Sequence, residues 1–332
     1  MSLNVPLRFN HLAFEKVWGG RALESFAEGA LPASGLVGEI WELVDRDGAS
    51  SKVASGPFEG RKLRGLMLSE SDDLLGRTKA NKGDYFPLLI KYLDAAQNLS
   101  VQVHPDERAA QSLGGGAESK TECWYILSAE PGARLYLGFK PGIERPSIAT
   151  KCASADIVEM LESYEVKAGD FVFVPPGTVH AIGAGITLVE VQENSDTTYR
   201  MYDWGRTGLD GEARECHIDE ALKSIDYASA APIPVQPEFT SDGGVNEHAP
   251  LVDCDVFTVD ALHVNGPLEG ETCGRAWIYI VTDGKGELTL PGRDETWALR
   301  RGETWLLPAS LGSYRLDSVD GQLKMLRVET KA

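Results

Sequence analysis

The strongest constraint on the fold of this 332-residue chain is a series of short β-type segments separated by glycine and proline turns. β-branched, leucine and aromatic residues fill these segments, which is typical of strands. The segments cover residues 86–93, 99–103, 123–127, 134–137, 171–174 and 187–192. Because turns rather than long helices join them, the pattern predicts a mainly β fold of antiparallel sheets, arranged as a sandwich or a jelly roll.

A few short helices are expected to decorate these sheets. The clearest candidate is 154–162, where Ser154 can cap the first turn and Ile157, Met160 and Leu161 share one face. Residues 217–225 have a similar pattern, and 60–75 is a third candidate with an uncertain end.

A weak internal repeat indicates two copies of one β-rich unit. The octapeptide AGDFVFVP at 168–175 resembles RGETWLLP at 301–308, an offset of 133 residues, and WYI at 124–126 resembles WIY at 277–279. The proline-rich stretch 231–247 is the expected boundary, which gives units of 1–230 and 248–332. At the same offset Ser313 stands opposite His180, so any metal chemistry is expected in the first copy alone.

The net charge of −18 disfavours nucleic acid and anionic membranes as partners. It would also repel a phosphorylated substrate, so such a substrate requires a local cluster of Lys and Arg. The five cysteines are odd in number and have no CxxC spacing, which argues against a disulfide framework and a thiolate zinc site. With no apolar run near the roughly 18 residues of a membrane span, a soluble cytoplasmic protein is expected.

Four polar residues in strand-like settings form a candidate metal site. Gln102 and His104 alternate onto one face of an apolar strand, Glu122 lies on a second strand, and His180 follows a Pro-Pro-Gly turn. Each alone has an ordinary explanation, such as a solvated strand face, a surface ion pair or a hydrogen-bonded histidine. Together they form a nitrogen and oxygen donor set suited to Zn²⁺, and also to Mn²⁺, Co²⁺ or Fe²⁺.

The local positive cluster is expected from four residues. Arg200 and Arg206 lie among aromatic residues, which suggests partly buried guanidinium groups that need anionic partners, and Lys91 and Lys120 add two ammonium groups. Arg200 and Arg206 could also be ordinary surface charges, and Glu190 shares a strand face with Gln192.

Five motifs resemble those of bacterial mannose-6-phosphate isomerases of the short type I class, which are cupins. They are FPLLIKYLDA, LSVQVHP, KTECWYI, GDFVFVPPGTVHAIG and VQENSDTTYRMYDWGR, and the resemblance covers about residues 8–225 in order and spacing. It implies two cupin-like jelly-roll units, of barrel or sandwich form, the second degenerate. It also implies one zinc ion on Gln102, His104, Glu122 and His180, and a catalytic arginine at Arg200.

The resemblance further implies that Lys91, Ser100 and, less closely, Arg206 contact the substrate phosphate, and that Lys120 and Glu190 line the pocket. The expected reaction interconverts mannose 6-phosphate and fructose 6-phosphate through a cis-enediolate, which needs a proton carrier and a group that holds negative charge. Arg200 suits the charge but is a poor proton carrier. Glu190, Lys120 and a metal-bound water therefore remain as candidates for the proton transfer.

Other functions compete with this interpretation. Two histidines and one carboxylate on a cupin sheet are also an iron-oxygenase pattern, although Gln102 and the nearby Lys and Arg residues argue against it. A sugar-binding cupin without activity should lack Arg200 or a metal ligand. The substrate could also be a related or an unphosphorylated sugar. Apart from a small-molecule substrate, the expected state is a monomer or a weak homodimer.

Overall fold

The predicted strands form in a computed structural model that describes residues 3–27, 31–241 and 243–331, and the fold is mainly β as predicted. The strands are β6 (Leu88–Ala95), β7 (Val101–Val103), β8 (Glu122–Ala129), β9 (Arg134–Phe139), β11 (Phe171–Val174) and β13 (Ile186–Glu193). The observed bounds of β11 are those predicted, and the bounds of the other five differ by a few residues.

Two of the three helix predictions need correction. The predicted helix 154–162 shrinks to α5 (Asp156–Glu159), and the chain then enters the strand β10 (Leu161–Glu165). Residues 60–75 form two helices, α1 (Leu63–Ser69) and α2 (Ser71–Leu75), which are separated at Glu70. The third prediction is confirmed as α6 (Ile218–Ser224). Tertiary pairing decides the first case, because residues 161–165 pair with β9 instead of completing a third helical turn.

The remaining helical segments are short. They are α3 (Glu107–Leu113), α4 (Arg145–Lys151) and the 3₁₀ turns Ala22–Ser25 and Ala309–Leu311. The side chain of Asp106 caps α3 by accepting a hydrogen bond from the amide of Ala109 at 2.6 Å. None of the helices in the described ranges has the length and apolarity needed to cross a membrane.

The first unit consists of two open antiparallel sheets. One has the order β11-β8-β13-β6-β3-β2, where β3 is Val37–Leu43 and β2 is Leu12–Gly20. The other has the order β10-β9-β12-β7-β14, where β12 is His180–Ile182 and β14 is Tyr199–Tyr202. Apolar side chains from both sheets, such as Leu93, Trp124 and Leu137, fill part of the space between them.

The second unit repeats this order. Its sheets are β1-β21-β18-β23-β16-β15 and β17-β22-β19-β20. The strands are β1 (Leu7–Arg8), β15 (Glu247–Asp253), β16 (Phe257–Val264), β17 (Leu268–Glu271), β18 (Trp277–Asp283), β19 (Lys285–Thr289), β20 (Thr296–Arg300), β21 (Thr304–Leu307), β22 (Ser313–Ser318) and β23 (Leu323–Thr330). β1 comes from the start of the chain and pairs with β21, so the N-terminal strand lies in a sheet of the second unit. A separate short hairpin joins β4 (Asp45–Arg46) to β5 (Ala49–Ser50).

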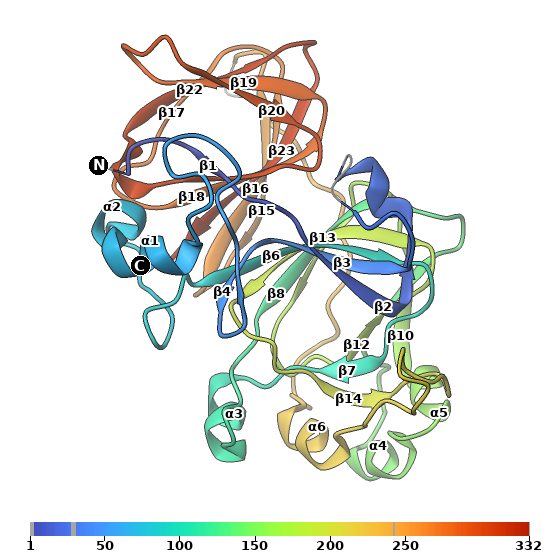
Figure 1. Ribbon diagram of the computed structural model, residues 1–332. Helices are drawn as coiled ribbons and strands as arrows, with labels where there is room; N and C mark the ends of the chain where they lie inside the picture. The colour runs from blue at the N-terminus through green and yellow to red at the C-terminus, as the bar shows by residue number, and fades with distance from the viewer. Residues whose placement is uncertain (1–2, 28–30, 242, 332) are drawn as a thin grey trace.

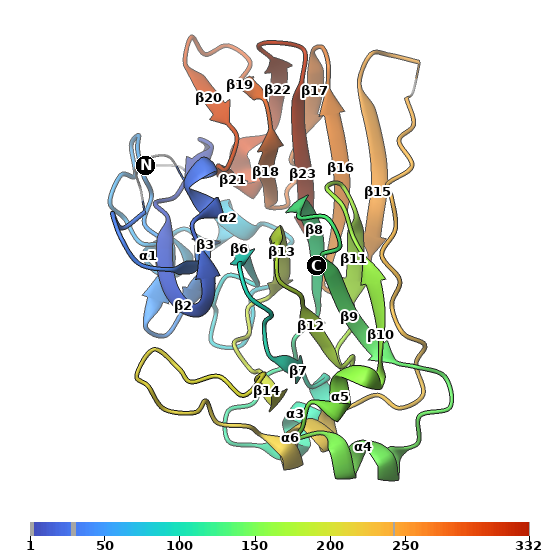
Figure 2. The ribbon, with the colours of Figure 1, turned by 90° about the vertical axis from the view of Figure 1, so that its right-hand side faces the viewer.

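The two six-stranded sheets pack against each other through one shared apolar core. This core includes Tyr92 and Val189 from the first unit and Ile278, Leu306 and Val328 from the second. Each fully buried aliphatic side chain of this kind contributes about 1.5–3 kcal/mol. Figures 1 and 2 show the second unit, in orange and red, stacked on the first, in blue to yellow. Because side chains alternate along a strand, neighbours of the shared-core residues, such as Lys91, face the interior of the first unit.

Strand register shows which residues occupy equivalent places in the two units. β11 and β21 differ by the predicted 133 residues, and β12 and β22 begin at His180 and Ser313 at the same offset. The tryptophan match is shifted by two residues. Glu122 pairs with Val174 and Trp277 pairs with Leu307, so Trp277 occupies the place of Glu122 rather than that of Trp124.

Candidate metal centre and active site

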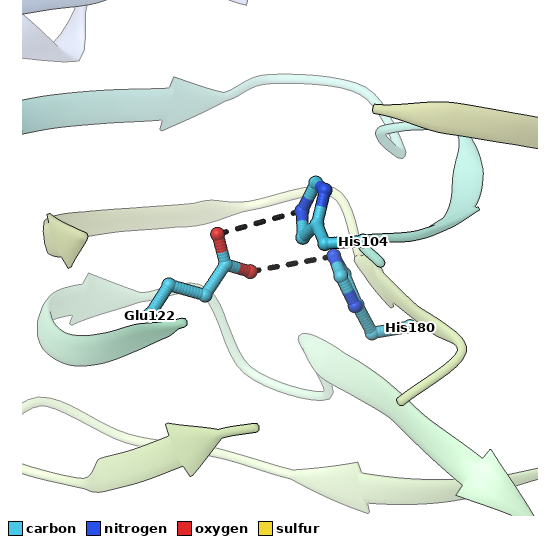
Figure 3. Close-up of side chains that lie close together, drawn as sticks. All are labelled: His104, Glu122 and His180. Carbon is cyan, nitrogen blue, oxygen red and sulfur yellow. Dashed lines mark ion pairs between the residues drawn. The ribbon is translucent and has the colours of Figure 1, made fainter. Parts of the chain in front are cut away.

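Three of the four predicted metal ligands meet inside the first unit. The Nε2 atom of His104 lies 3.5 Å from Oε2 of Glu122, and Nε2 of His180 lies 3.4 Å from Oε1 of the same carboxylate. All three side chains are buried, and their donor atoms lie within 4.8 Å of one another. Figure 3 shows both imidazoles facing the Glu122 carboxylate.

Strand pairing and one turn bring these ligands together. His180 lies opposite Gln102 in the β12–β7 pair, which aligns two ligand positions on one sheet. Gly177 has a positive φ of 84°, a conformation that favours glycine, and its amide donates to the carbonyl oxygen of His104 at 2.8 Å. This hydrogen bond links the Pro-Pro-Gly turn to His104. Because His180 follows Gly177 by three residues, the turn places His180 near His104.

Both imidazoles present a free lone pair to the carboxylate. Nδ1 of His104 lies 2.8 Å from the carbonyl oxygen of Thr197, and Nδ1 of His180 lies 2.9 Å from that of Thr178. A carbonyl only accepts hydrogen bonds, so the neutral rings carry their proton on Nδ1 and leave Nε2 unprotonated. Backbone carbonyls of this kind orient metal-binding histidines in many sites.

The protonation states also suit a metal. Burial, helped by the nearby His104 and Lys120, lowers the pKa of His180 to about 4, so this imidazole is neutral at pH 7. Burial by itself raises the pKa of Glu122, but the ammonium group of Lys120 outweighs it and holds the pKa well below its usual value. A neutral His180 imidazole and an ionised carboxylate therefore face one another beside His104, a donor set that suits a divalent cation.

Gln102 stands beside this group as the fourth predicted ligand. Its Nε2 lies 3.2 Å from Nε2 of His180, and its Oε1 lies 3.1 Å from the hydroxyl of Ser100. The hydroxyl both donates and accepts, so Ser100 can hold either orientation of the amide. The predicted phosphate contact Ser100 is thus placed where it orients Gln102, and its side chain is buried.

A row of alternating charges continues from the metal ligands into the interior. Nζ of Lys120 lies 2.8 Å from Glu122 and 3.7 Å from Glu190, and Nζ of Lys91 lies 3.1 Å from Glu190. All four residues are buried. Ion pairs this deep keep their geometry only when each charge has a partner, so the row is a fixed feature of the interior.

The guanidinium groups lie at the other side of the metal ligands. Arg200 pairs in register with Gln102, and its Nη1 donates to the carbonyl oxygen of Glu215 at 2.6 Å. Burial, together with the charge of Arg214, lowers the pKa of Arg200, which as a guanidinium stays cationic at neutral pH. Its Nε is buried and has no hydrogen-bond partner among the described residues.

Asp203 ties two further arginines to this side of the site. Its Oδ1 accepts from Nη2 of Arg206 at 2.8 Å, and its Oδ2 accepts from Nε of Arg214 at 2.7 Å. Arg206 also donates to the carbonyl oxygen of Asn98 at 2.5 Å. Burial raises the pKa of Asp203, but the two arginines lower it by more, so the carboxylate is ionised. Three arginines and one aspartate leave a net local charge of about +2 in an acidic protein.

The structure therefore brings the predicted residues together in two groups. Lys91, Lys120 and Glu190 lie on the carboxylate side of the ligands, while Arg200 and Arg206 lie on the arginine side. Sequence reasoning missed Arg214, which lies in a loop without regular periodicity. It also missed Glu39, a buried carboxylate near Lys91, although the two glutamates in the mostly apolar run VGEIWEL could have drawn attention to it.

The second unit keeps none of this site at the equivalent positions. Strand register places Glu271, Trp277 and Ser313 where the first unit has Gln102, Glu122 and His180. A tryptophan in place of the carboxylate and a serine in place of the imidazole remove two ligands.

Comparisons with known proteins agree on one family. The model of the type I phosphomannose isomerase catalytic domain matches residues 7–125, and that of the mannose-6-phosphate isomerase cupin domain matches residues 247–330. The mannose-6-phosphate isomerase ManA of Bacillus subtilis is 34% identical over 316 residues, which cover 94% of this chain and 96% of that protein. The mannose-6-phosphate isomerase of Streptococcus mutans is 35% identical over 312 residues, with coverages of 94% and 95%.

Solved structures give the same result. The crystal structure of the mannose 6-phosphate isomerase from Bacillus subtilis superposes with a TM-score of 0.87 at 31% identity and covers 97% of this chain and 99% of that one. A mannosephosphate isomerase structure from Archaeoglobus fulgidus, described as putative, shares the fold with a TM-score of 0.76 at 24% identity, over 98% of both chains.

Proposed function

The chain belongs to the type I phosphomannose isomerase family, and we propose that it interconverts mannose 6-phosphate and fructose 6-phosphate at the centre formed by Gln102, His104, Glu122 and His180. The observation that carries this assignment of the site is the convergence of the Nε2 atoms of two histidines on one buried carboxylate. We propose residues 1–230 as the catalytic unit, apart from β1, which lies in a sheet of the second unit, and residues 248–332 as a unit that binds no metal.

We propose zinc as the metal, with Mn²⁺, Co²⁺ or Fe²⁺ as substitutes, because imidazole, carboxylate and amide donors suit these ions. Bound there, the ion supplies a Lewis acid for the substrate's hydroxyl and carbonyl oxygens. The buried group near the site carries about one negative charge among the described residues, from Lys91, Lys120, Glu39, Glu122 and Glu190. A bound divalent cation would therefore leave this group with a net charge of only about +1.

The isomerisation moves a proton between C1 and C2 through a cis-enediolate. We assign the proton transfer to Glu190, whose carboxylate lies 3.1 Å from the ammonium group of Lys91 and 3.7 Å from that of Lys120. Lys120, which contacts Glu122 as well, is the alternative proton carrier. Arg200 holds the negative charge that develops on the enediolate, since its Nε is buried and free to donate.

The substrate phosphate is assigned to the arginine side of the site. Arg206 is fixed by Asp203 and by the carbonyl oxygen of Asn98, and Arg214 reinforces the positive charge. A phosphate dianion prefers guanidinium groups, which bind it through paired hydrogen bonds. The five free thiols fit a reducing cytoplasm, and the proposed state is a monomer or a weak homodimer.

Incubation with fructose 6-phosphate tests the function directly. The zinc-loaded protein should form mannose 6-phosphate, lose this activity after exhaustive chelation and regain it with Zn²⁺. Free fructose run in parallel tests the need for phosphate. Another sugar phosphate as the product would refute the substrate assignment, and turnover that survives chelation would refute the metal assignment. Oxygen uptake with Fe²⁺ would instead support an oxygenase.

A further inference from the structure

The buried ammonium group of Lys91 contacts one carboxylate, that of Glu190, and feels the charge of a second, that of Glu39. Its Nζ is 3.1 Å from Oε1 of Glu190, and the side chains of both residues are 6% exposed. Burial by itself lowers the pKa of Lys91, but Glu190 and Glu39 outweigh it and raise the pKa above its ordinary value. Lys91 is therefore a permanent cation whose charge is already balanced by its neighbours.

Glu39 is fixed on the far side of Lys91 by two contacts of its own. Its Oε2 accepts a hydrogen bond from Nε1 of Trp41 at 2.7 Å, and its Oε1 lies 3.2 Å from Nζ of Lys16. The ring of Trp41 lies 5.3 Å from Nζ of Lys91, and Trp41, Lys91 and Glu190 occupy one row across three adjacent strands. Glu39 and Trp41 thus form a rigid support behind the Lys91–Glu190 pair.

The second unit provides an internal comparison. The places of Lys91 and Glu190 are taken there by Asp260 and Arg327, which form an ion pair of opposite polarity at 2.8 Å. The ion pair by itself therefore occurs without metal ligands. The support does not recur, because strand register places His248 and Pro250 where the first unit has Glu39 and Trp41. Among the described residues, the support accompanies the unit that carries the metal ligands.

The charges around Lys91 also bear on its relation to a phosphate. Lys91 and Glu190 neutralise each other and Lys16 pairs with Glu39, so this group offers a phosphate dianion no net positive charge, whereas the cluster of Arg200, Arg206, Arg214 and Asp203 is net positive. The two clusters are chemically distinct, and only the arginine cluster attracts a phosphate.

We propose that Lys91 and Glu39 are positioning residues for the isomerisation rather than phosphate contacts. Glu39, held by Trp41, keeps Lys91 against Glu190, and Lys91 keeps the Glu190 carboxylate at a fixed distance from Lys120 and the metal ligands. Small displacements of a proton-transfer group reduce turnover strongly, so loss of the support should lower kcat and leave phosphate recognition intact. This inference rests on the proposed function, and on Glu190 as the proton acceptor.

The test is Glu39→Gln, which removes the charge but keeps an oxygen for the indole of Trp41. The matched control is Glu42→Gln, a buried carboxylate on the same strand whose side chain contacts His11 instead of Lys91. For each variant, kcat and KM for fructose 6-phosphate and the inhibition constant of inorganic phosphate are measured on zinc-loaded protein. Trp41→Phe, which keeps a ring beside Lys91 but releases Glu39, is a second variant in case Glu39→Gln does not fold.

The expected result for Glu39→Gln is a kcat lower by about tenfold to a hundredfold, with KM and the phosphate inhibition constant within about twofold of the unchanged protein. Trp41→Phe should lower kcat in the same direction, and Glu42→Gln should leave all three constants unaltered. An unchanged kcat in Glu39→Gln, an equal loss in Glu42→Gln, or a raised KM and phosphate inhibition constant would each overturn the inference. Failure of the proposed function itself is distinguishable, because the unsubstituted protein would then form no mannose 6-phosphate.

Discussion

Replacement of Arg200 by methionine should separate activity from stability. The substitution removes one hydrogen bond, from Nη1 to the carbonyl oxygen of Glu215, which is worth about 1 kcal/mol. It also removes the repulsion between Arg200 and Arg214 that contributes to the lowered pKa of Arg200. These effects oppose each other, and Asp203 keeps both of its guanidinium partners. The free energy of unfolding should therefore change by no more than about 1 kcal/mol.

Activity should fall far more than stability. Removal of one donor to a developing oxyanion costs about a hundredfold to a thousandfold in kcat, or about 2.7–4 kcal/mol. Because Arg200 is not among the proposed ligands, metal content should stay at one ion per chain. The assays are urea unfolding, metal analysis by mass spectrometry, and rates of mannose 6-phosphate formation.

Arg206→Met is the matched control for this experiment. It leaves Asp203 with Arg214 as a partner and should raise KM for fructose 6-phosphate more than it lowers kcat, because Arg206 is assigned to the phosphate. A kcat close to that of the unchanged protein in Arg200→Met would remove Arg200 from the mechanism. Loss of the metal in the same variant would show that its role is structural.

Three further predictions concern the metal, pH and packing. His104→Ala should lose metal and activity together, measured by metal analysis and turnover; an active, metal-free variant would contradict the ligand assignment. Burial lowers the pKa of His11, but its bond to Glu42 outweighs this and raises the pKa above the ordinary 6.5. The protonated His11 therefore stabilises the folded state fully below about pH 6.5, and this contribution is lost as the pH rises through the folded pKa. Urea unfolding at rising pH should show this loss, and its persistence in Glu42→Gln would refute the cause. Gly302→Ala should destabilise by about 1–3 kcal/mol, because φ is +86° and the added Cβ would lie 1.8 Å from the carbonyl oxygen of Phe26; an unchanged melting temperature would contradict this.

The limits of sequence reasoning appear at particular elements. The strand 171–174 was predicted to the residue because its apolar run ends abruptly at glycine and proline turns. The helix 154–162 was overextended because Ile157, Met160 and Leu161 have helical spacing, and only pairing with β9 decides that Leu161 begins a strand. The repeat was found at its true offset of 133, but the tryptophan match was shifted by two residues. Similar amino acids in two segments do not establish which residues pair in the sheet.

The sequence by itself determined the β class, and it predicted the two-unit organisation and the residue types of the proposed metal centre. These follow from local patterns: turn chemistry, alternation along a strand, and donor atoms at fixed positions. Only the tertiary structure decided which charges face one another. Glu39 and Lys91 are 52 positions apart in the chain, and Lys91 and Glu190 are 99 apart. Strand pairing places Lys91 opposite Glu190 and opposite Trp41, two residues from Glu39 on the next strand. Electrostatic roles depend on distances of a few ångströms between such residues, so the separation of a positioning side from a phosphate side could be seen only after the sheets had formed.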